Sequence, residues 1–446
     1  MEERALRAIA GLLEERSLEG YLVGGYVRDR LLGRPSVDID LVVERQAVEL
    51  AKEAADRLGG SFFVLDEETE VARVILKEEP GPILFIDFAL MRAGSILGDL
   101  ALRDFTLDAM AMKIGSPLLI DPHGGQRDLE ARWLRAVSER IFQDDPLRML
   151  RAVRLAAELN LRIDPKVEKL IREGSALLSE VSEERIRDEL AKILLLPGTS
   201  CHLSRLDDLG LLREILPEIT ALRGVGESGE GLRALYLHSL AVVDGLERIL
   251  AGEAVPLAPL DQKLSVHVEE ELGGGRPRLV SLKLAALFQK VGGSAFPAMR
   301  RLRFSRREIA LVQAILKGYL RPKELSARED ASDLGAYRFF RHRGKAGIDI
   351  LLLSLAEYLV MEQTGAQIEG FPELVGSFLR KYYEERERVI SPPKLISGHD
   401  LQAKFGLAPG TRLGELLEQV REARVRGWVA TREEALEFVG RILAER

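Results

Sequence analysis

Two aspartates one residue apart, Asp38 and Asp40, lie in an apolar run that predicts a β-strand. Residues two apart on a strand point to the same side, about 6 to 7 Å apart along it, so the two carboxylates converge on one small volume. Mg²⁺ prefers oxygen ligands and keeps water and substrate phosphates in its shell, and a pair of ions about 4 Å apart can activate a hydroxyl and stabilise a leaving pyrophosphate. The spacing therefore predicts a Mg²⁺ site, against the alternative of two exposed acids on a solvated strand.

Three features around this strand could hold the phosphates of a nucleotide and complete the site. Gly24 and Gly25 let the backbone approach a ligand, and the helix expected after them offers unpaired N–H groups to an anion. Arg28, one turn into that helix, could reach a triphosphate oxygen; the alternative is an ion pair with Asp29 or another exposed acid. Asp87 lies in an apolar strand, where a buried charge is costly without a compensating cation, and is the candidate third carboxylate.

The elements that must position these groups follow from the hydrophobic pattern. Six β-rich runs, interspersed with helical pieces, lie in the first third of the chain: 20–25, 37–44, 61–66, 72–78, 83–90 and 108–115. From Asp144 onward, apolar residues recur at the three-and-four spacing of amphipathic helices. The clearest runs are 147–160, 182–195 and 309–320. We therefore expect an α+β head, a mixed β-sheet with flanking helices, followed by all-α domains with breaks near 196–200, 273–277 and 391–397.

The composition excludes several classes of protein. The chain has 446 residues, 46% of them hydrophobic and 30% charged, and a net charge of −7. It contains no run of roughly twenty apolar residues, and its acidic, amphipathic start is unlike a signal peptide, so we expect a cytoplasmic protein with no membrane partner. The single cysteine, Cys201, excludes internal disulfides and is expected to be a buried small residue. Because the net charge is negative, local basic patches must carry any contact with RNA.

Five segments, in order, resemble the motifs of class II tRNA nucleotidyltransferases, the CCA-adding enzymes and their relatives the bacterial poly(A) polymerases. The first matches G-G-x-V-R-D-x-L-L-G-R-x-x-x-D-x-D, and the five segments are 24–40, 102–111, 121–129, 144–154 and 182–190. The resemblance implies a head with the polymerase β-like nucleotidyltransferase fold in an elongated chain of several domains. The implied domains are the head at 1–138, a helical neck for base recognition at 139–200, a helical body at 201–390 and a helical, tRNA-binding tail at 391–446.

The fourth segment suggests how a nucleotide is chosen. Cytosine and adenine both present an amino donor beside a ring-nitrogen acceptor, and a carboxylate next to a guanidinium complements both, whereas uracil and guanine present the reverse order. Asp145 and Arg148, three residues apart and therefore expected on one face of a helix, offer this pair, and the resembled family uses it as a protein template. The expected substrates are therefore CTP and ATP; an ion-paired solvent face on the helix is the alternative.

Other positions carry over from the family individually. Arg103 and Asp104 fall where relatives contact the nucleotide and its sugar, and Arg151 and Arg154 are expected partners for phosphates. Three residues depart from the family pattern without removing a metal ligand: Leu102 for Arg, Asp108 for Asn and Asp144 for Glu.

The remainder of the chain predicts a scaffold and an RNA-binding tail. Phe288 and Gln289 stand where many relatives carry the His-Asp doublet of a phosphohydrolase, so we expect a helical body without that chemistry and a structural role for His238. A denser basic patch lies within the body: Arg300, Arg301, Arg303, Arg306 and Arg307. The tail offers these cations to RNA phosphates, with a solvated face as the alternative: Lys404, Arg412, Arg421, Arg424 and Arg426.

The product is expected to depend on the short segment 91–98, which follows the strand of Asp87. Full CCA-adding enzymes often carry a longer flexible loop there, and its loss in the family is associated with enzymes that add only two cytidines. The sequence thus favours CC addition to tRNA, with A addition and full CCA addition as alternatives. A bacterial poly(A) polymerase and a non-catalytic RNA-binding scaffold compete with this interpretation; the tRNA-type tail disfavours the first, and the intact carboxylates and base-reading pair disfavour the second.

Overall fold

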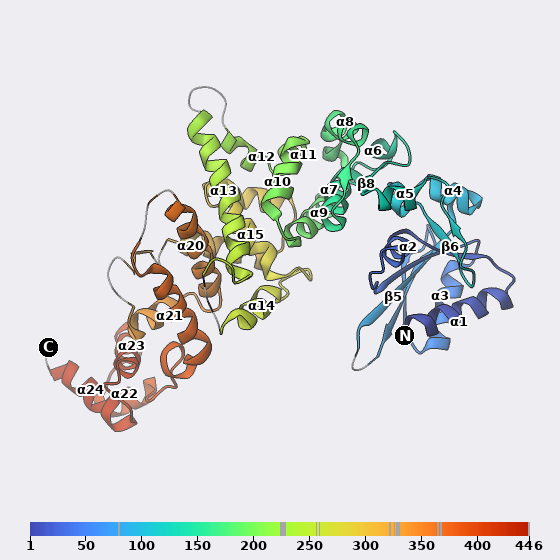
Figure 1. Cartoon of the computed structure of the whole chain (residues 1–446). Coiled ribbons are helices and arrows are strands. Elements are labelled where there is room, and N and C mark those ends of the chain that lie inside the picture. The colour runs from blue at the N-terminus through green and yellow to red at the C-terminus, as the bar shows by residue number, and fades with distance from the viewer. Residues whose placement is uncertain are drawn as a thin grey trace. The chain divides into compact units, whose positions relative to one another are not determined.

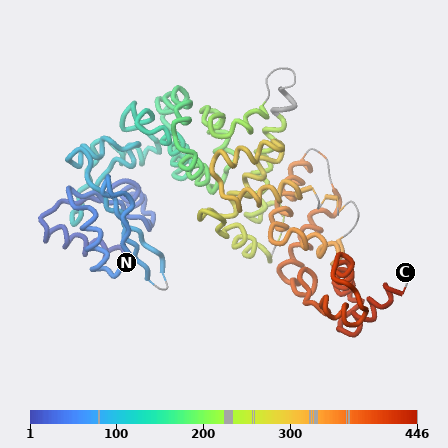
Figure 2. Tube along the Cα trace, turned by 180° about the vertical axis from the view of Figure 1, so that it is seen from behind, coloured from blue at the N-terminus to red at the C-terminus, as the bar shows by residue number. Residues whose placement is uncertain are grey.

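The computed structural model describes residues 1–78, 81–223, 229–255, 257, 259–320, 323, 324, 326, 331–363, 365 and 368–444. The chain divides into two compact units (Figures 1 and 2). The first unit comprises Met1–Glu189 and Arg205–Ile215, and the second comprises Leu190–Ser204 and Leu216–Arg446. No helix among the described residues is long and apolar enough to cross a membrane.

A mixed seven-stranded sheet organises the first unit, in the order β3-β4-β5-β2-β1-β6-β7. The strands are β1 (Gly20–Val23), β2 (Asp38–Val43), β3 (Ser61–Asp66), β4 (Val71–Lys77), β5 (Ile83–Leu90), β6 (Ala111–Lys113) and β7 (Leu119–Ile120). Strands β2 and β5 are parallel, and the other pairs are antiparallel. All six runs expected to be strands form β1 to β6, so the prediction of a mixed-sheet head is confirmed.

The two faces of the sheet bury different sets of side chains. Ile39 and Leu41 of β2 join one hydrophobic core with α1 (Glu2–Glu15) and α3 (Ala47–Leu58). Val42 points to the other face, into a smaller cluster that includes Leu100 of α4 (Ile96–Ala101). Because side chains alternate along a strand, Asp38 and Asp40 lie on the face of Val42. The large core thus fixes the strand, and the thinly covered face presents the carboxylates.

Short helices surround this second face and continue into the helical part of the first unit. Helix α2 (Gly24–Leu31) begins directly after β1, where Gly24 has a φ of 65°, and ends before Gly33, which has a φ of 66°. The two-stranded pair β8 (Trp133–Leu134) and β9 (Arg162–Ile163) is parallel. The other helices are α5 (Gly125–Glu130), α6 (Ile141–Asp144), α7 (Arg148–Leu159), α8 (Pro165–Gly174) and α11 (Leu211–Ile215), with 3₁₀ turns η1 (Arg92–Gly94), η2 (Thr106–Asp108) and η3 (Ser175–Glu180). Helices α9 (Glu183–Leu195) and α10 (Thr199–Asp208) each contribute residues to both units.

The described part of the second unit is helical, as expected. Its longer helices are α13 (Gly229–Leu250), α14 (Asp261–Glu269), α15 (Arg278–Phe288), α17 (Arg306–Gly318), α19 (Asp333–Arg341), α20 (Ala346–Gln363), α21 (Phe371–Glu384), α22 (Gly398–Phe405), α23 (Thr411–Val425) and α24 (Arg432–Ala444). Shorter pieces are α12 (Pro217–Thr220), α16 (Ala295–Arg301), η4 (Ala221–Arg223), η5 (Gly292–Ser294) and a π-helical turn, η6 (Arg386–Ile390). Helices α22 to α24 share a small core around Leu401, Leu416 and Val439. The expected breaks at 273–277 and 391–397 fall between helices, and the one at 196–200 covers the connection after α9 and the first two residues of α10.

The expectation that Cys201 is buried is wrong, because the residue is exposed. Helix α10 buries Thr199, Leu203 and Leu206, which share one stripe of the helix. Cys201 lies off that stripe.

Candidate active site

Strand β2 carries the two aspartates at the spacing that the sequence predicts. Asp38 begins the strand and is exposed, whereas Asp40 is half-buried. In the parallel pairing of β2 with β5, Asp40 lies directly beside Asp87. Asp87 alternates with Ile86 and Phe88, which enter the large core, so it faces the same side of the sheet as Asp40.

The electrostatics of this face favour a cation. Burial raises the pKa of Asp40 to about 6, the charges of Asp87 and Asp38 act in the same direction, and the Arg103 guanidinium opposes them. Carboxylates that repel one another in this way are stabilised by a divalent ion, and oxygen donors are those that Mg²⁺ prefers. The residues present therefore fit a metal at Asp38 and Asp40.

Asp87, the expected third carboxylate, has a cationic partner on the neighbouring strand. Arg73 of the neighbouring strand β4 donates from Nε to Oδ1 and from Nη2 to Oδ2, both at 2.7 Å. Within the described ranges, no three carboxylate, imidazole or thiol groups form a ready-made metal cluster. Asp87 is thus adjacent to Asp40 but is not assembled with Asp38 and Asp40 into a three-ligand site.

The turn before α2 closes tightly over Asp40. A Cβ atom at Gly24 would lie 2.9 Å from Nη1 of Arg103 and 3.5 Å from Oδ2 of Asp40, so a larger residue would collide with the site. Arg103 is held from its other side by the buried Asp99, which accepts from Nε at 3.1 Å and from Nη2 at 3.0 Å. Gly24, Arg103 and Asp40 are therefore neighbours, as a nucleotide site on this face requires.

Arg28 is engaged by acids rather than free for a triphosphate. Its Nη1 donates to Asp108 at 2.7 Å, and its Nε donates to Asp29 at 2.9 Å. Both Arg28 and Asp108 are buried. Burial raises the pKa of Asp108, and the Arg28 guanidinium opposes that shift. The alternative expected for Arg28, an ion pair with Asp29, is observed, with a second and buried partner, Asp108, at a position where the resembled family commonly has Asn.

Two of the arginines on α7 are also paired. Arg151 donates to Asp104 at 2.8 Å. Arg154 is bound by Glu189 and Glu158, both at 2.8 Å, and its side chain is only 13% exposed. Arg154, expected to bind phosphates, therefore serves to join α7 to α9 in this structure.

The base-reading pair lies at the start of α7, but not on one helical face as expected. Asp145 has an extended backbone (φ −153°, ψ 102°) between α6 and α7, because its own carboxylate accepts from the N–H of Leu147 at 3.2 Å. Its other oxygen accepts from Arg185 of α9 at 2.8 Å. Arg148, the first residue of α7, donates to the Leu102 carbonyl at 3.1 Å. Leu102, where the family commonly has Arg, makes this contact through its backbone carbonyl. Any residue at this position could make the same contact.

Sequence reasoning missed several partners that organise the site. Arg73, Asp99 and Arg185 each hold a predicted site residue through an ion pair. Only Arg185 had a visible signal, because it lies inside the fifth motif segment at 182–190. Arg73 and Asp99 reach their partners through strand register and a short helix, which no local pattern indicates.

The expected RNA-binding cations of the tail differ in what they contact. Arg412 and Arg421 pair with acids of their own helix, Glu415 at 3.3 Å and Glu418 at 3.2 Å. Arg424 donates to a backbone carbonyl of the preceding segment. The other two lie against aromatic rings: Lys404 over Phe405 and Arg426 over Trp428.

The position of the hydrolase doublet is filled by a closed ion network. His238 contacts Glu357 at 2.7 Å, and Lys290, next to Gln289, contacts the other oxygen of Glu357 at 3.0 Å. Burial alone would raise the pKa of Glu357, but the hydrogen bond from His238 and the charge of Lys290 lower it to about 2. This pairing agrees with a structural role for His238.

Three family models match successive parts of the chain. They are described as a poly A polymerase head domain at residues 20–135, a probable RNA and SrmB-binding site of polymerase A at 160–222, and domain 2 of tRNA nucleotidyltransferases at 281–439. The first match contains the β2 carboxylates, and the second contains Arg185.

Relatives match over almost the whole chain. A CC-adding tRNA nucleotidyltransferase of Geobacter sulfurreducens is 35% identical over 97% of this chain and 94% of its own length. An A-adding tRNA nucleotidyltransferase of Deinococcus radiodurans is 32% identical over 94% of this chain and 94% of its own length. A solved structure of a CCA-adding enzyme with ATP has a TM-score of 0.72 and 24% identity, covers 98% of this chain and 94% of its own, and shows the same fold.

Proposed function

The chain belongs to the tRNA nucleotidyltransferases, and on that premise we propose that it adds two cytidines from CTP to the 3′ end of tRNA without a nucleic-acid template. One observation carries the choice of CC: the connection from β5 to α4 consists of five residues, 91–95, that contain only the 3₁₀ turn η1. The resembled CCA-adding enzymes often have a long flexible loop at this place. The similarity to the CC-adding relative supports the proposal, and the similarity to the A-adding relative makes A addition the second candidate.

The family uses divalent metal ions, and we propose Mg²⁺ as the ion and Asp38 and Asp40 as its protein ligands. When bound there, the ions would polarise the attacking 3′-hydroxyl and neutralise charge on the departing pyrophosphate. Asp87 remains the proposed third carboxylate, with Arg73 as its partner before substrate enters. Gly24 and Gly25 would admit the triphosphate to the start of α2, where unpaired N–H groups face an anion.

Selection of the base is assigned to Asp145 and Arg148. The Asp145 carboxylate would accept from the amino group of cytosine or adenine, and Arg148 would donate to the ring nitrogen. Arg148 uses one of its five N–H donors on the Leu102 carbonyl, so the others are left for the base. Uracil or guanine would place a carbonyl against Asp145 and an N–H against Arg148, leaving both pairs unsatisfied. Arg103, Asp104 and Arg151 complete the proposed nucleotide contacts.

The remaining assignments concern the larger partner and the cell. The proposed division is a head at 1–138, a neck at 139–200, a body at 201–390 and a tail at 391–446, of which the tail binds tRNA. Cytoplasm is the proposed compartment, because the chain belongs to a family of tRNA-processing enzymes.

A product assay tests the proposal. Purified protein is incubated with tRNA that lacks its CCA end, or that ends in C or CC, with CTP and ATP separately and together, and the products are resolved at single-nucleotide length. We expect CTP to extend the first tRNA by two nucleotides and the second by one, and the third to remain unextended. Extension of the CC-ending tRNA with ATP would overturn CC addition, and long ATP tails on unstructured RNA would assign a poly(A) polymerase. The Asp40→Asn variant is the negative control, since it removes a proposed metal ligand.

A further inference from the structure

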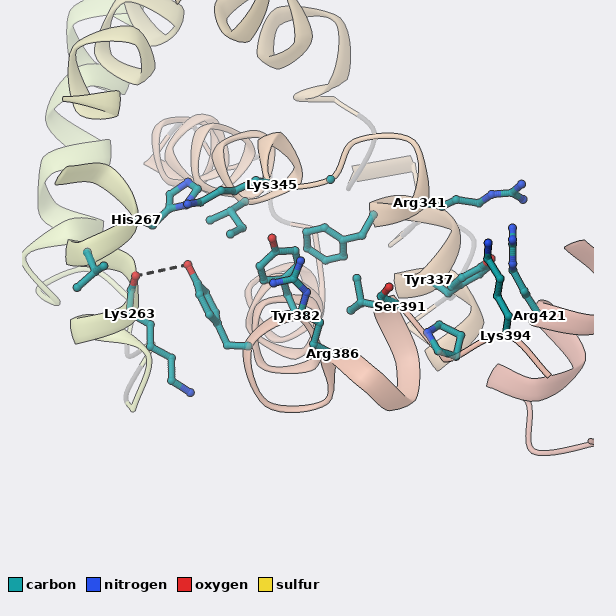
Figure 3. Close-up of a pocket in the computed structure, with 17 residues that line it drawn as sticks. Lys263, His267, Tyr337, Arg341, Lys345, Tyr382, Arg386, Ser391, Lys394 and Arg421 are labelled. Atoms are coloured by element: carbon teal, nitrogen blue, oxygen red, sulfur yellow. Dashed lines mark hydrogen bonds between the residues drawn. The ribbon is translucent and has the colours of Figure 1, made fainter. Parts of the chain in front are cut away.

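A cleft of about 650 Å³ lies wholly within the second unit (Figure 3). Helices α14, α19, α20 and α21, the turn η6 and the start of the segment before α22 contribute to its walls, with one residue from α23. The close-up places Lys263 and His267 at one end, Arg341, Lys394 and Arg421 at the other. None of these elements contains a residue of the active site.

The walls of this cleft are strongly basic. Among the residues that line it are six cations and no aspartate or glutamate: Lys263, Arg341, Lys345, Arg386, Lys394 and Arg421. The whole chain carries a net charge of −7, so this concentration of positive charge is local. A ligand that enters the cleft meets cations on each side and is expected to be an anion.

Acids behind the walls neutralise only part of this charge. Four of the six cations are paired: Arg341 and Arg421 share Glu418, Lys263 contacts Glu384 at 3.4 Å, and Lys345 contacts Glu270 at 2.7 Å. Arg386 lies over the ring of Tyr382, 5.4 Å from its centroid. Within the described part of the chain, neither Arg386 nor Lys394 has a carboxylate within ion-pair distance, and both side chains belong to exposed residues. These two cations are therefore available to a ligand.

Aromatic rings form the floor between the cations. Tyr382 packs against Phe340 with centroids 4.7 Å apart and against Tyr383 with centroids 5.3 Å apart. Tyr382 and Phe340 are buried, whereas Tyr383 is half-buried, with its hydroxyl donating to the Lys263 carbonyl at 3.4 Å. A partly open ring beside free cations is the combination by which proteins bind an unstacked base together with its phosphates.

The wall also contains a polar atom without a partner. His267 is 3% exposed and contacts Asp349 through Nε2 at 3.1 Å. Its Nδ1 is buried and has no hydrogen-bond partner among the described residues. Because Nδ1 is closed off from solvent, it is not offered to a ligand, which would contact the cations and the rings instead.

We propose that this cleft binds an unstacked nucleotide of RNA, with its base or ribose against Tyr383 and its phosphate against Arg386, and that Lys394, at the other end of the cleft, takes a phosphate of the adjoining chain. The inference deepens the proposed function and takes the tRNA from it as the source of the nucleotide. The 3′-terminal nucleotide must lie at Asp38 and Asp40, so the cleft takes a different nucleotide of the same molecule. The outer cations of the tail, such as Lys404 and Arg426, are then secondary to the cleft.

Charge reversal separates the cleft from the tail. We compare Arg386→Glu with Lys394→Glu, combined in one protein, against Lys404→Glu with Arg426→Glu, and against Arg7→Glu with Lys52→Glu on the exposed surface of α1 and α3. All three proteins change charge by the same amount. Binding of fluorescent tRNA is measured by anisotropy over a series of salt concentrations. We expect only the cleft variant to raise the Kd more than tenfold and to lower the salt slope by about two.

Tyr383→Leu keeps an apolar side chain and removes the stacking ring. We expect it to weaken tRNA binding several-fold, to raise the KM for tRNA and to leave kcat and the KM for CTP unchanged; circular dichroism checks the fold. Ultraviolet irradiation of the complex should cross-link tRNA to the peptide that contains Tyr382 and Tyr383.

Three outcomes would overturn the cleft assignment. These are loss of tRNA binding in the tail variant but not in the cleft variant, no cross-link to this peptide, and displacement of the tRNA cross-link by millimolar CTP or ATP, which would assign the cleft to a free nucleotide. Binding does not depend on catalysis, so a protein that binds tRNA through the cleft but adds no nucleotide would refute the proposed function alone.

Discussion

Arg185 of α9 donates a hydrogen bond from Nη2 to Oδ2 of Asp145 at 2.8 Å, joining the fifth motif segment to the residue proposed to read the base. Asp145 lies in an extended connection between two helices and therefore lacks the support of a helical backbone. The arginine supplies that support from a separate helix. Asp145 still has lone pairs for an amino group, because a carboxylate accepts up to about four hydrogen bonds.

Removal of this arginine should weaken nucleotide recognition. In Arg185→Ala, Asp145 loses its partner and samples other rotamers, so we expect kcat/KM for CTP to fall about tenfold, equivalent to roughly 1.4 kcal/mol. The KM for tRNA should not change. Steady-state incorporation of CTP measures this, with Lys192→Ala as the control on the same helix. An equal loss in the control, or a loss confined to the KM for tRNA, would contradict the role of Arg185.

The carboxylates of β2 should be essential for the reaction but not for the fold. We expect Asp38→Asn and Asp40→Asn each to lower single-turnover CTP incorporation by about 10³-fold or more, because each removes charge from the proposed Mg²⁺ site. Burial and like charges raise the pKa of Asp40, so a neutral amide at this position should not lower the thermal stability. The exposed Asp56→Asn on α3 is the control. Retained activity in Asp40→Asn would remove the metal assignment.

Asp87 and Arg73 can be assigned by the metal dependence of the reaction. If Asp87 is the third carboxylate, Asp87→Asn should raise the Mg²⁺ concentration for half-maximal activity about tenfold, since one ligand charge is lost. Arg73→Gln removes the partner of Asp87 but no metal ligand, and should leave that concentration unchanged or lower. Titration of activity with Mg²⁺ distinguishes the two. Identical behaviour of both variants would restrict Asp87 to its ion pair with Arg73.

The stability of the second unit should depend on pH through Glu357. Its pKa is lowered from 4.5 to about 2 in the folded chain, so its contribution is complete above pH 4.5 and is lost as the pH falls toward 2. The shift corresponds to about 3 kcal/mol. Urea unfolding should therefore show Glu357→Gln to be less stable by about this amount at pH 7, and the difference should shrink to under half by pH 3. Glu373→Gln, exposed on α21, is the control; a deficit that is independent of pH would argue against the ionised pair.

The fold of the head could be predicted because its pattern is local. Each of the six β-rich runs became a strand. The spacing of Asp38 and Asp40 on one face follows from strand geometry alone. That Asp87 lies beside Asp40 does not follow from local geometry. It depends on the register of β2 against β5, which pairs residues more than forty positions apart in the sequence.

The partners of the site residues could not be predicted for the same reason. Periodicity on α7 suggested that Asp145 and Arg148 share a face, but the short Asp145 carboxylate instead bonds the N–H of Leu147 and interrupts the helix. The position of Arg28 in the motif predicted a contact with a phosphate. Its ion pair with Asp108 depends on a tertiary contact that the sequence does not show. Cysteines are buried on average, but Cys201 is exposed because it lies outside the stripe of residues that α10 buries.

The contacts of Glu357 with His238 and Lys290 have a consequence for the enzyme's dependence on its surroundings. The Lys290 ammonium is covalently part of the chain, so Glu357 has its counter-charge from the moment of synthesis and needs no metal ion at this place. Depletion of divalent ions should therefore stop nucleotide addition at the head, while the helical body stays folded and remains bound to its RNA. Addition of the ion should then restore activity without refolding.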